Sequence, residues 1–543
     1  MAKGVLVSAS TVFVGDEPNY GTGGDYWRSS PPRASMMDTS GIAGSLPLTS
    51  LSLDTALLQW GVDTSALSKI GFYLDTFVYQ NGTIDMGHWK DVWPDAGEGI
   101  YNCTFPDGLS DHGRIVQMFC DAVRYTRDVE WMTSHIDPVL RIGEYLLKSR
   151  AEAVSAFPPG DPRHGLIYGP AEHDTCDMGM GKSAPVYDGQ TMLYYFSVSM
   201  WHWRGMVELG QLLLDYPQAS SNASFAHKLL DEAPRFKADI DAAVARSIVR
   251  FSNGSIRFVP AAVAPVGVAP SVYPSMTSDV LSSYSNFRYY SEMLGAFQMN
   301  DETATALMNF RESNGGTLSG MTRFTDHLDD MPALGYAESS LGFDRVDKFL
   351  LLLYGHAANY QGRGSFFSTE QMSLYAGSPS WRATLGEIQA DFCTPSQTLV
   401  ASMTAMQLVY SERDASVLWL ARAAPRRWYG INGGGFAARN APSRFGNISF
   451  AITPSSNTTA VVTVAADFRQ PAGSADRPPP TIRIRIRDPA KGSGALVAVS
   501  AKDGSDCTVV AGSINRVSDT VDILPSPGSS LVIQGCVLDT TVA

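Results

Sequence analysis

The spacing of apolar residues changes once along the chain, and this change constrains the fold more than any other feature. From about residue 50 to residue 430, apolar residues recur at the spacing of amphipathic helices. From about residue 440 onward, they alternate with polar residues in short runs separated by turn residues, as in β-strands. Gly433, Gly434 and Gly435 lie at the change and predict a linker, because no βαβ pattern surrounds them.

The first part of the chain predicts eight or more helices with no strands between them. In the clearest one, Ser110 and Asp111 supply N-cap chemistry, and Ile115, Val116 and Phe119 begin an apolar stripe. Further helices are expected at residues 64–79, 131–147, 189–214, 223–250, 274–297, 344–357 and 396–411. Helices without intervening strands exclude a doubly wound sheet and favour a bundle, a solenoid or a toroid of helical hairpins.

The last part of the chain predicts a β-sandwich of about 100 residues. Its clearest strand, residues 481–487, alternates isoleucine and arginine, so Ile482, Ile484 and Ile486 should share the buried face. The arginines between them are expected on a solvated outer face. Cys507 and Cys536 both fall in this part and are expected to pair if the protein is secreted.

Charge and hydropathy exclude two classes of partner. The chain carries 41 basic and 54 acidic residues, a formal net charge of −13, and no cluster of lysines or arginines. Nucleic-acid binding normally requires such a cluster, so we expect no nucleic-acid partner. No apolar stretch is long enough to span a bilayer, so we expect no membrane span.

The compartment is predicted from sequons and cysteines. Six N-x-S/T triplets occur, at Asn81, Asn102, Asn222, Asn253, Asn447 and Asn457. The six cysteines form no CxxC pair, so zinc sites of the usual spacing are not expected. The first twenty residues lack the basic and apolar regions of a signal peptide. We expect a secreted or extracytoplasmic protein whose leader has been removed; a cytoplasmic protein is the alternative.

The predicted loops between the helices are long and combine aromatic residues with carboxylates. Aromatic faces can stack on the C–H surfaces of a sugar while carboxylates bind its hydroxyls, so these loops predict a carbohydrate site. The expected substrate contacts are Trp89, Trp93, His112, His173, Asp174 and Tyr336.

Three segments could carry chemistry, and each also has a purely structural interpretation. Asp111 and His112 open a helix, where they either bind substrate hydroxyls or cap the helix. The segment from Gly165 to Asp177 holds Glu172, His173 and Asp174, which suit an active-site loop, a solvated loop or a metal site. Glu370 follows a glycine-rich turn and either serves in catalysis or caps a helix. Two carboxylates flanking a glycosidic bond can act as acid and as base or nucleophile.

Several of these phrases together resemble the six-hairpin glycosidases, which are (α/α)6-barrel enzymes. The phrases are Asp111-His-Gly113, Tyr125 to Asp128, Trp131, Gly165-Leu-Ile with Glu172, Asp347 to His356, Phe366 to Gln371, Val417 to Arg422, and Pro425 to Trp428. The resemblance covers roughly residues 50–540 and concerns architecture rather than a particular substrate. It implies catalytic carboxylates in loops at one end of the barrel, which Glu172 and Glu370 match, and a trailing β-sandwich.

The resemblance and the residues together predict three parts. Residues 1–50 form an N-terminal segment that either precedes the barrel or belongs to it. Residues 51–435 form the (α/α)6 barrel, a toroid of helical hairpins, and residues 436–543 form an antiparallel β-sandwich.

The predicted function is a glycoside hydrolase acting on an oligo- or polysaccharide. Glu172 and Glu370 are the expected catalytic pair, with Asp111 as a third catalytic candidate, and inversion is the expected outcome. No cofactor and no resident metal are expected. Two alternatives stay open: a polysaccharide lyase that uses a tyrosine or histidine base on a uronate, and a carbohydrate-binding scaffold without catalysis.

Overall fold

The structure is a computed structural model in which two compact units are described. It describes residues 13–14, 17–18, 47–84, 109–169, 194–217, 222–264, 270, 272, 276, 285–324, 327–330, 332–361, 368, 371–374, 394–475, 480–490, 496–502, 504–525 and 532–542. Unit 1 comprises Met1–Thr55, Thr64–Cys120 and Glu130–Ala401, and unit 2 comprises Ala56–Asp63, Asp121–Val129 and Ser402–Ala543.

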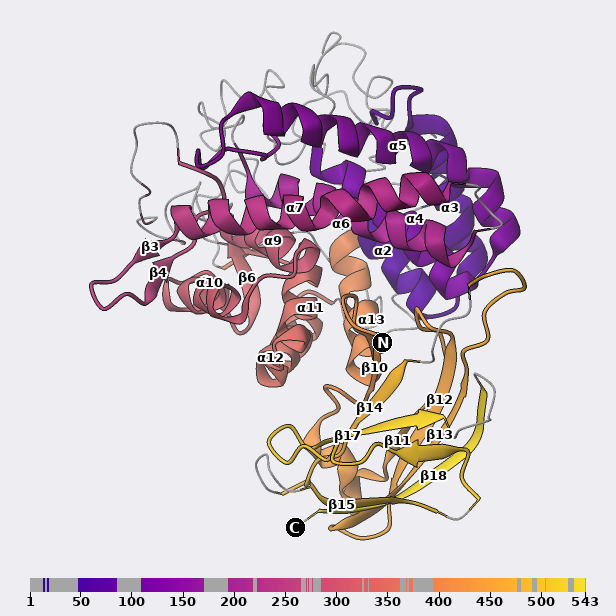
Figure 1. The fold of residues 1–543 in the computed structure, drawn as a ribbon. Helices are drawn as coiled ribbons and strands as arrows, with labels where there is room; N and C mark the ends of the chain where they lie inside the picture. The colour runs from indigo at the N-terminus through magenta and orange to yellow at the C-terminus, as the bar shows by residue number, and fades with distance from the viewer. Residues whose placement is uncertain are drawn as a thin grey trace, which may run out of the picture. The chain divides into compact units, whose positions relative to one another are not determined.

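Helices form most of the described part of the chain before residue 409, and sheets form most of the described part after it (Figure 1). This order agrees with the change in apolar spacing. The helices are α2 (Pro47–Gln59), α3 (Asp63–Phe77), α4 (Leu109–Thr126), α5 (Val129–Ala156), α6 (Phe196–Asp215), α7 (Ala223–Ser247), α9 (Tyr290–Ala296), α10 (Asp301–Ser313), α11 (Leu334–Gly342), α12 (Val346–Asn359) and α13 (Thr394–Leu408). A π-helix, η7 (Ser285–Tyr289), leads directly into α9.

Helix α6 is buried along almost its whole length. Nearly all its residues are buried, whereas α7, which packs along it, buries only one stripe. A helix that is buried on all sides lies inside a core, and a helix with one buried stripe covers that core. The side chains that α6 presents therefore lie inside unit 1 rather than on its surface.

Two helix pairs of unit 1 approach closely at glycines. A Cβ added to Gly113 of α4 would lie 1.9 Å from the carbonyl oxygen of Trp201 on α6. A Cβ added to Gly335 of α11 would lie 2.0 Å from the carbonyl oxygen of Ser291 on α9. Because these neighbours are backbone atoms, neither pair could keep its spacing with a larger residue.

Short strands lie between the helices of unit 1, so the prediction that none would occur was wrong. A two-stranded sheet pairs β3 (Val249–Arg250) with β4 (Ile256–Phe258). A four-stranded antiparallel sheet has the order β5 (Thr317–Leu318), β6 (Met321–Phe324), β7 (His327–Asp329), β8 (Gln371–Ser373). Another short pair is β1 (Phe13–Val14) with β2 (Glu17–Pro18). Strands of two to four residues are too short to show an alternating pattern.

The described part of unit 2 contains two five-stranded sheets. The first has the order β16 (Cys507–Val509), β17 (Thr520–Pro525), β14 (Thr481–Arg485), β10 (Val417–Leu420), β9 (Val409–Ser411). The second has the order β11 (Phe436–Ala441), β12 (Asn447–Pro454), β13 (Thr459–Asp467), β18 (Val532–Val542), β15 (Leu496–Ala501). Apolar residues from both sheets form one buried core.

Two details of unit 2 differ from the prediction. Strand β10 runs parallel to β14, so the sheets are not wholly antiparallel. The segment from Val417 to Arg422, which resembles a barrel helix in sequence, supplies this strand. Three of its four strand residues are buried, and a short apolar run of this kind does not distinguish a buried strand from a buried helix.

Strand β14 has the predicted buried isoleucine face, but the prediction of a solvated arginine face was wrong at Arg485. Ile482 and Ile484 have no exposed surface, as expected. Arg483 lies at the surface and donates two hydrogen bonds to Asp522 at 2.6 and 2.8 Å. Arg485, however, is 1% exposed and donates to the carbonyl oxygens of Arg422 and Ser518. The outer face is therefore covered, not solvated, at Arg485.

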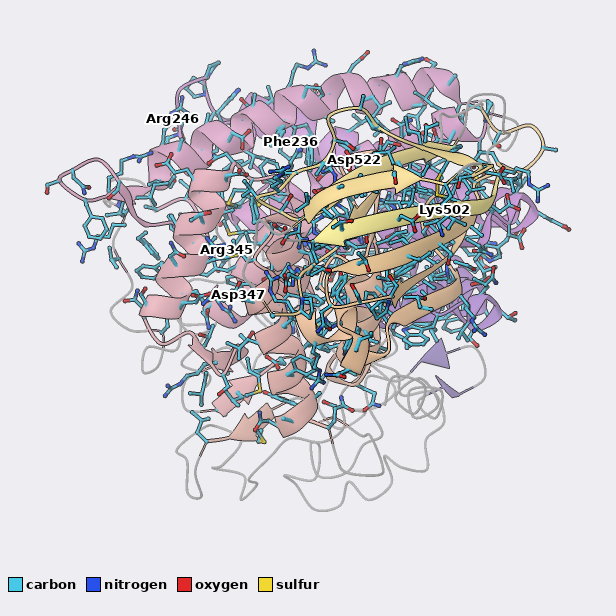
Figure 2. The ribbon with its side chains drawn as sticks, turned by 90° about the horizontal axis from the view of Figure 1, so that it is seen from below. Phe236, Arg246, Arg345, Asp347, Lys502 and Asp522 are labelled. Carbon is cyan, nitrogen blue, oxygen red and sulfur yellow. A yellow bond between two sulfur atoms is a disulfide. The ribbon has the colours of Figure 1, made fainter. Side chains whose placement is uncertain are left out.

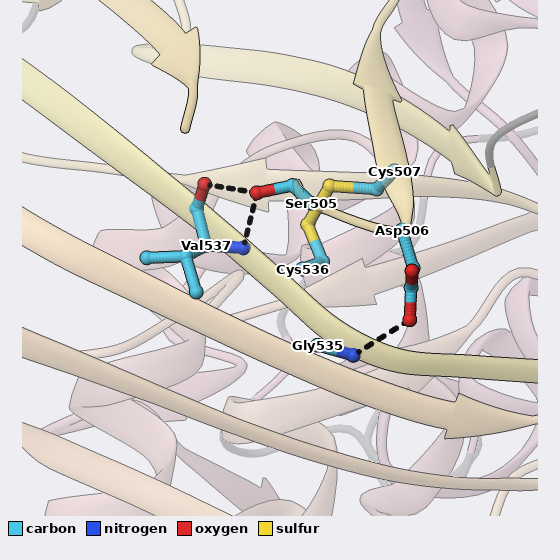
Figure 3. Close-up of a disulfide and its surroundings, with 6 residues drawn as sticks. All are labelled: Ser505, Asp506, Cys507, Gly535, Cys536 and Val537. Carbon is cyan, nitrogen blue, oxygen red and sulfur yellow. Dashed lines mark hydrogen bonds between the residues drawn. A yellow bond between two sulfur atoms is a disulfide. The ribbon is translucent and has the colours of Figure 1, made fainter. Parts of the chain in front are cut away.

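Cys507 and Cys536 form the predicted disulfide, which joins β16 of one sheet to β18 of the other (Figure 3). Their Cα atoms are 5.2 Å apart. Beside the bond, the Ser505 hydroxyl donates to the carbonyl oxygen of Val537 and accepts from its N–H. Lys502, labelled in Figure 2, lies on the sheet surface, and its Nζ is 3.3 Å from Oδ1 of Asp539. No helix in the described ranges is long and apolar enough to cross a membrane.

Candidate active site

Four helical segments of unit 1 begin with polar side chains that are fully or almost fully buried. The segments are α4, α6, η7 and α13, and each starts soon after a long stretch outside the described residues. The buried polar residues in their first turns are Asp111, His112, Ser197, Ser199, Asn286, Arg288, Ser396 and Gln397. Buried polar groups need partners, so the contacts among these helix starts define what the region can do.

A four-residue ion network connects the start of α4 to η7 and α9. Arg114 contacts Oδ1 of Asp111 through Nη1 and lies 2.6 Å from Oε1 of Glu292 through Nη2. Nε of Arg288 lies 2.9 Å from the same Oε1. Each of the four residues is at most 3% exposed. Two carboxylates and two guanidinium groups cancel in charge, which makes their burial possible. Burial lowers the pKa of Arg288, although the Glu292 carboxylate opposes this.

Glu292 is a candidate residue that the sequence prediction missed. Its Oε1 atom meets both arginines, whereas its Oε2 atom is buried and has no hydrogen-bond partner in the described part of the protein. A π-helix lies immediately before α9, and such segments occur frequently at functional sites. The i,i+4 spacing of Arg288 and Glu292 was the available sequence signal. Such a pair is common on exposed helices, so it could not single out this carboxylate.

Asp111 and His112 open α4 as predicted, and both point into unit 1. The His112 ring stacks on Tyr145 with centroids 4.5 Å apart and lies 6.0 Å from the ring of His202 on α6. Asp111 is 1% exposed and His112 is 0% exposed. In the described structure, their partners are therefore protein side chains.

His202 should make unit 1 sensitive to acid. Its Nδ1 lies 3.1 Å from the carbonyl oxygen of Val198, and burial lowers its pKa from 6.5 to about 4. The contribution of the neutral His202 ring to the free energy of unfolding is fully present above pH 6.5. It is lost as the pH falls from 6.5 through 4. This shift in pKa corresponds to roughly 3 kcal/mol in the free energy of unfolding. We expect His202→Gln to reduce the drop in unfolding temperature between pH 7 and pH 4.5, measured by circular dichroism.

His227 provides the control because it is an exposed histidine on α7. His227→Gln should lose as much stability on acidification as the wild type. If the unfolding temperature falls equally in the wild type and in His202→Gln between pH 7 and pH 4.5, the His202 ring is not buried in its neutral form.

Tyr336, predicted as a substrate contact, lies in a second buried polar cluster. It is 3% exposed, and its hydroxyl donates to the carbonyl oxygen of Asn286. The guanidinium of Arg311 lies 3.7 Å from the centre of its ring. Burial raises the pKa of Tyr336 well above its usual value. These contacts engage both the ring and the hydroxyl with neighbouring protein groups.

The same cluster contains a buried pair, Asp330 and His356. Nδ1 of His356 lies 3.0 Å from Oδ2 of Asp330, whose Oδ1 accepts from the N–H of Thr322 at 2.7 Å. Nε2 of His356 lies 2.9 Å from the carbonyl oxygen of Ser396 in the first turn of α13. The pair thereby connects β6, α12 and α13 inside unit 1.

Six predicted site residues lie outside the described residues. They are Trp89, Trp93, Glu172, His173, Asp174 and Glu370. Their roles remain predictions. The described residues on either side of Glu172 and Glu370 can still be placed.

The segment that carries Glu172 begins and ends at neighbouring points of unit 1. Buried Arg150 donates to the carbonyl oxygen of Gly165 at 2.7 Å and packs over the ring of Phe236 on α7. Figure 2 labels Phe236. Tyr168 before the segment and Tyr194 after it have ring centroids 5.0 Å apart. The described residues on the two sides of this segment therefore lie next to each other.

The chain is also held on both sides of Glu370. The N–H of Ser368 donates to Oε1 of Gln397 at the start of α13, at 2.7 Å. Gln371 opens β8 and lies opposite Asp329 of β7. The described residues nearest to Glu370 in the sequence are therefore Ser368, which is bonded to a helix start, and Gln371, which is paired in a sheet.

The described residues include no group of three or more histidine, cysteine, aspartate or glutamate side chains that could hold a metal ion. The alternative metal site at His173, Asp174 and Asp177 lies outside them.

No protein-family model matches the chain, and no curated protein sequence matches it. Among solved structures, one similar chain is described as a glycosidase with a glutamate-to-alanine substitution. It has a TM-score of 0.47 and 13% sequence identity, over 74% of this chain and 95% of that one. Another is described as a glycosidase with such a substitution in complex with glucose. It has a TM-score of 0.46 and 12% identity, over 74% and 95% of the two chains.

Proposed function

We propose that the protein is a glycoside hydrolase that cleaves an oligo- or polysaccharide with two carboxylates, Glu172 and Glu370. The observation that carries the proposal is how the chain is held beside these residues. The N–H of Ile167, in the segment that leads to Glu172, donates to the hydroxyl of Ser199 in α6 at 3.1 Å. Ser368, before Glu370, is bonded to α13 in the same manner. A loop whose ends are bonded to the starts of helices can place its side chains precisely. Acid–base catalysis requires such placement.

The ion network extends this proposal. Asp111 and Glu292 are bridged by one guanidinium group at the starts of α4 and α9. Each of these carboxylates is held by an arginine side chain, which suits a residue that shapes the site. We therefore assign Asp111 and Glu292 to the electrostatics and shape of the site, and proton transfer to Glu172 and Glu370. Inversion is the proposed outcome, for which the two carboxyl groups should be about 6.5–9.5 Å apart.

The remaining assignments follow from the resemblance of the sequence to the six-hairpin glycosidases. We propose Trp89, Trp93, His173 and Asp174 as sugar contacts, with His112 and Tyr336 supporting them from the buried side. We also propose that the helices of unit 1 form an (α/α)6 toroid and that the sheets of unit 2 form a sandwich. The predicted division near residue 435 lies too late in the chain, because β9 and β10 already belong to a sheet of unit 2. No cofactor or resident metal takes part in this mechanism.

We propose a secreted or extracytoplasmic location. The disulfide between Cys507 and Cys536 supports it, because such bonds persist in oxidising compartments and are rare in the cytosol of most organisms.

Hydrolysis and elimination can be separated with two readouts on one sample. We expect the full chain to release reducing ends from a neutral glycan in a panel of neutral and uronate-containing polysaccharides. Because hydrolysis adds water and leaves no double bond, the ultraviolet absorbance of an unsaturated uronate should not grow. Absorbance that grows on uronate substrates alone would establish the lyase. Binding without either product would establish the scaffold.

A further inference from the structure

Two exposed turns of unit 1 share one five-residue pattern: an aromatic residue, any residue, asparagine, glycine, and threonine or serine. The first is Tyr79-Gln-Asn81-Gly-Thr83, and the second is Phe251-Ser-Asn253-Gly-Ser255. The second connects β3 to β4, a hairpin that extends beyond α7 and α10 (Figure 1). The first lies between Val78 and Ile84, which form an antiparallel bridge. Each turn contains one of the six sequons.

The two turns also have the same hydrogen bonds. Oδ1 of Asn81 accepts the N–H of Thr83 at 3.1 Å and its hydroxyl at 2.7 Å. Oδ1 of Asn253 accepts the N–H of Ser255 at 3.0 Å and its hydroxyl at 2.7 Å. In both turns, the amide nitrogen Nδ2 of the asparagine is left without a protein partner among the described residues.

The glycine between asparagine and hydroxyl makes this geometry possible. Gly82 has a φ of +81° and Gly254 a φ of +85°. A left-handed residue at this point lets the chain turn back, and glycine adopts it without a steric penalty. The pattern is therefore built by the backbone in both turns. The first turn also contacts α5, because a Cβ at Gly82 would lie 2.1 Å from the carbonyl oxygen of Arg141, whose Nε donates to the carbonyl oxygen of Tyr79 at 3.2 Å.

Each turn also presents an aromatic residue that is about half exposed to solvent. Tyr79 is 51% exposed and Phe251 is 52% exposed. The N–H of Tyr79 donates to the carbonyl oxygen of Thr83, and the N–H of Phe251 to that of Ser255, both at 2.9 Å. The aromatic and hydroxyl residues are thus direct cross-strand neighbours, with the asparagine between them at the tip.

The other described sequons are built differently. Asn222 directly precedes α7, and its side chain makes no cap hydrogen bond. Asn447 begins β12, where Ser449 accepts the N–H of Asn440. Asn457 is exposed, but the hydroxyl of Thr459 is bonded to those of Ser455 and Ser456. Asn102 lies outside the described residues.

We propose that Asn81 and Asn253 are N-glycosylation sites and that the first sugar of each glycan covers the ring of Tyr79 or Phe251. The donor is an oligosaccharide linked to a lipid diphosphate. Nδ2 forms a bond to the anomeric carbon, the bond from that carbon to the diphosphate oxygen breaks, and the lipid diphosphate leaves with the electron pair. The amide loses one proton. The C–H face of a sugar can then stack on the aromatic ring beside it.

This inference does not rest on the glycoside hydrolase assignment. It requires a compartment where such donors are present, which agrees with the disulfide in unit 2. Loss of hydrolase activity, or its absence, would leave the modification unaffected.

Site occupancy is the first test. The full chain is secreted from a eukaryotic cell line, and glycans are removed with a peptide N-glycosidase in heavy-oxygen water, which labels each formerly glycosylated asparagine. Mass spectrometry of the peptides should find Asn81 and Asn253 labelled in most molecules, and Asn447 and Asn457 in few. Unlabelled Asn81 and Asn253, or equal labelling of Asn447 and Asn457, would overturn the proposal.

Chemical protection of a ring is the second test. Tetranitromethane nitrates exposed tyrosines, and Tyr79 should react several-fold more slowly in the glycosylated protein than in Asn81→Gln. Tyr168, which is 47% exposed, is the control and should react at the same rate in both. An unchanged rate at Tyr79, with Asn81 shown to be occupied, would refute stacking of the sugar on the ring.

Discussion

Glu172→Gln and Glu370→Gln are each expected to lower turnover by at least about 10²-fold, the lower end of what a positioned acid or base contributes. Glutamine keeps the shape of the side chain but can neither donate nor accept the proton that the reaction transfers. Substrate binding should therefore largely survive. Initial rates of reducing-end release, together with glycan binding measured by calorimetry, separate the two effects.

Two comparison variants make this result interpretable. Glu144 is an exposed glutamate on α5, and Glu144→Gln should leave turnover unchanged. Asp111→Asn removes a charge from the ion network and should lower turnover less than the Glu172 change does. If Asp111→Asn abolishes activity while Glu172→Gln leaves it intact, then Asp111 is the acid and Glu172 is not.

Gly113→Ala is expected to destabilise unit 1 by about 3 kcal/mol, the upper end of the usual cost of overpacking. The new methyl group would lie 1.9 Å from the carbonyl oxygen and 2.4 Å from the carbonyl carbon of Trp201. Both are backbone atoms, so α4 and α6 would have to separate. The movement would also disturb the stacking of Arg114 over the Trp201 ring, whose centre is 5.0 Å away. A lower urea midpoint in circular dichroism is the measurement.

Gly342→Ala is the matched control because Gly342 ends α11 with no atom within 4 Å of an added Cβ. Alanine favours helices by up to about 1 kcal/mol over glycine, so this variant should equal or exceed the wild type in stability. A Gly113→Ala protein as stable as the wild type would show that α4 and α6 are not in close contact there.

Helix positions were largely predictable where apolar periodicity was strong. The predicted ranges 64–79 and 223–250 correspond to α3, Asp63–Phe77, and α7, Ala223–Ser247. Helix α10 was missed because its apolar residues are diluted by threonine, asparagine and glutamate, although Asn300 caps it by accepting the N–H of Thr303. Helix α11 was missed because it has nine residues, with a glycine at the second position.

The candidate site was predictable only in part, because its partners are distant in the sequence. Asp111 and His112 were correctly placed at the start of a helix. Their inward orientation depends on Glu292 and His202, which belong to other helices. Arg485 illustrates the same limit in unit 2, since strand alternation predicted an exposed side chain. Its burial depends on acceptors at Arg422 and Ser518, which no local pattern reveals.

The place of β18 in its sheet has a consequence for the order of assembly in unit 2. This strand lies between β13 and β15, both of which precede it in the chain. Until β18 is inserted, each of them presents an open edge, and such edges readily pair with other chains. Cys536 lies on β18, so oxidation with Cys507 can follow insertion and retain the strand. A failure of this late step would leave an otherwise folded unit prone to association, with its two cysteines reduced.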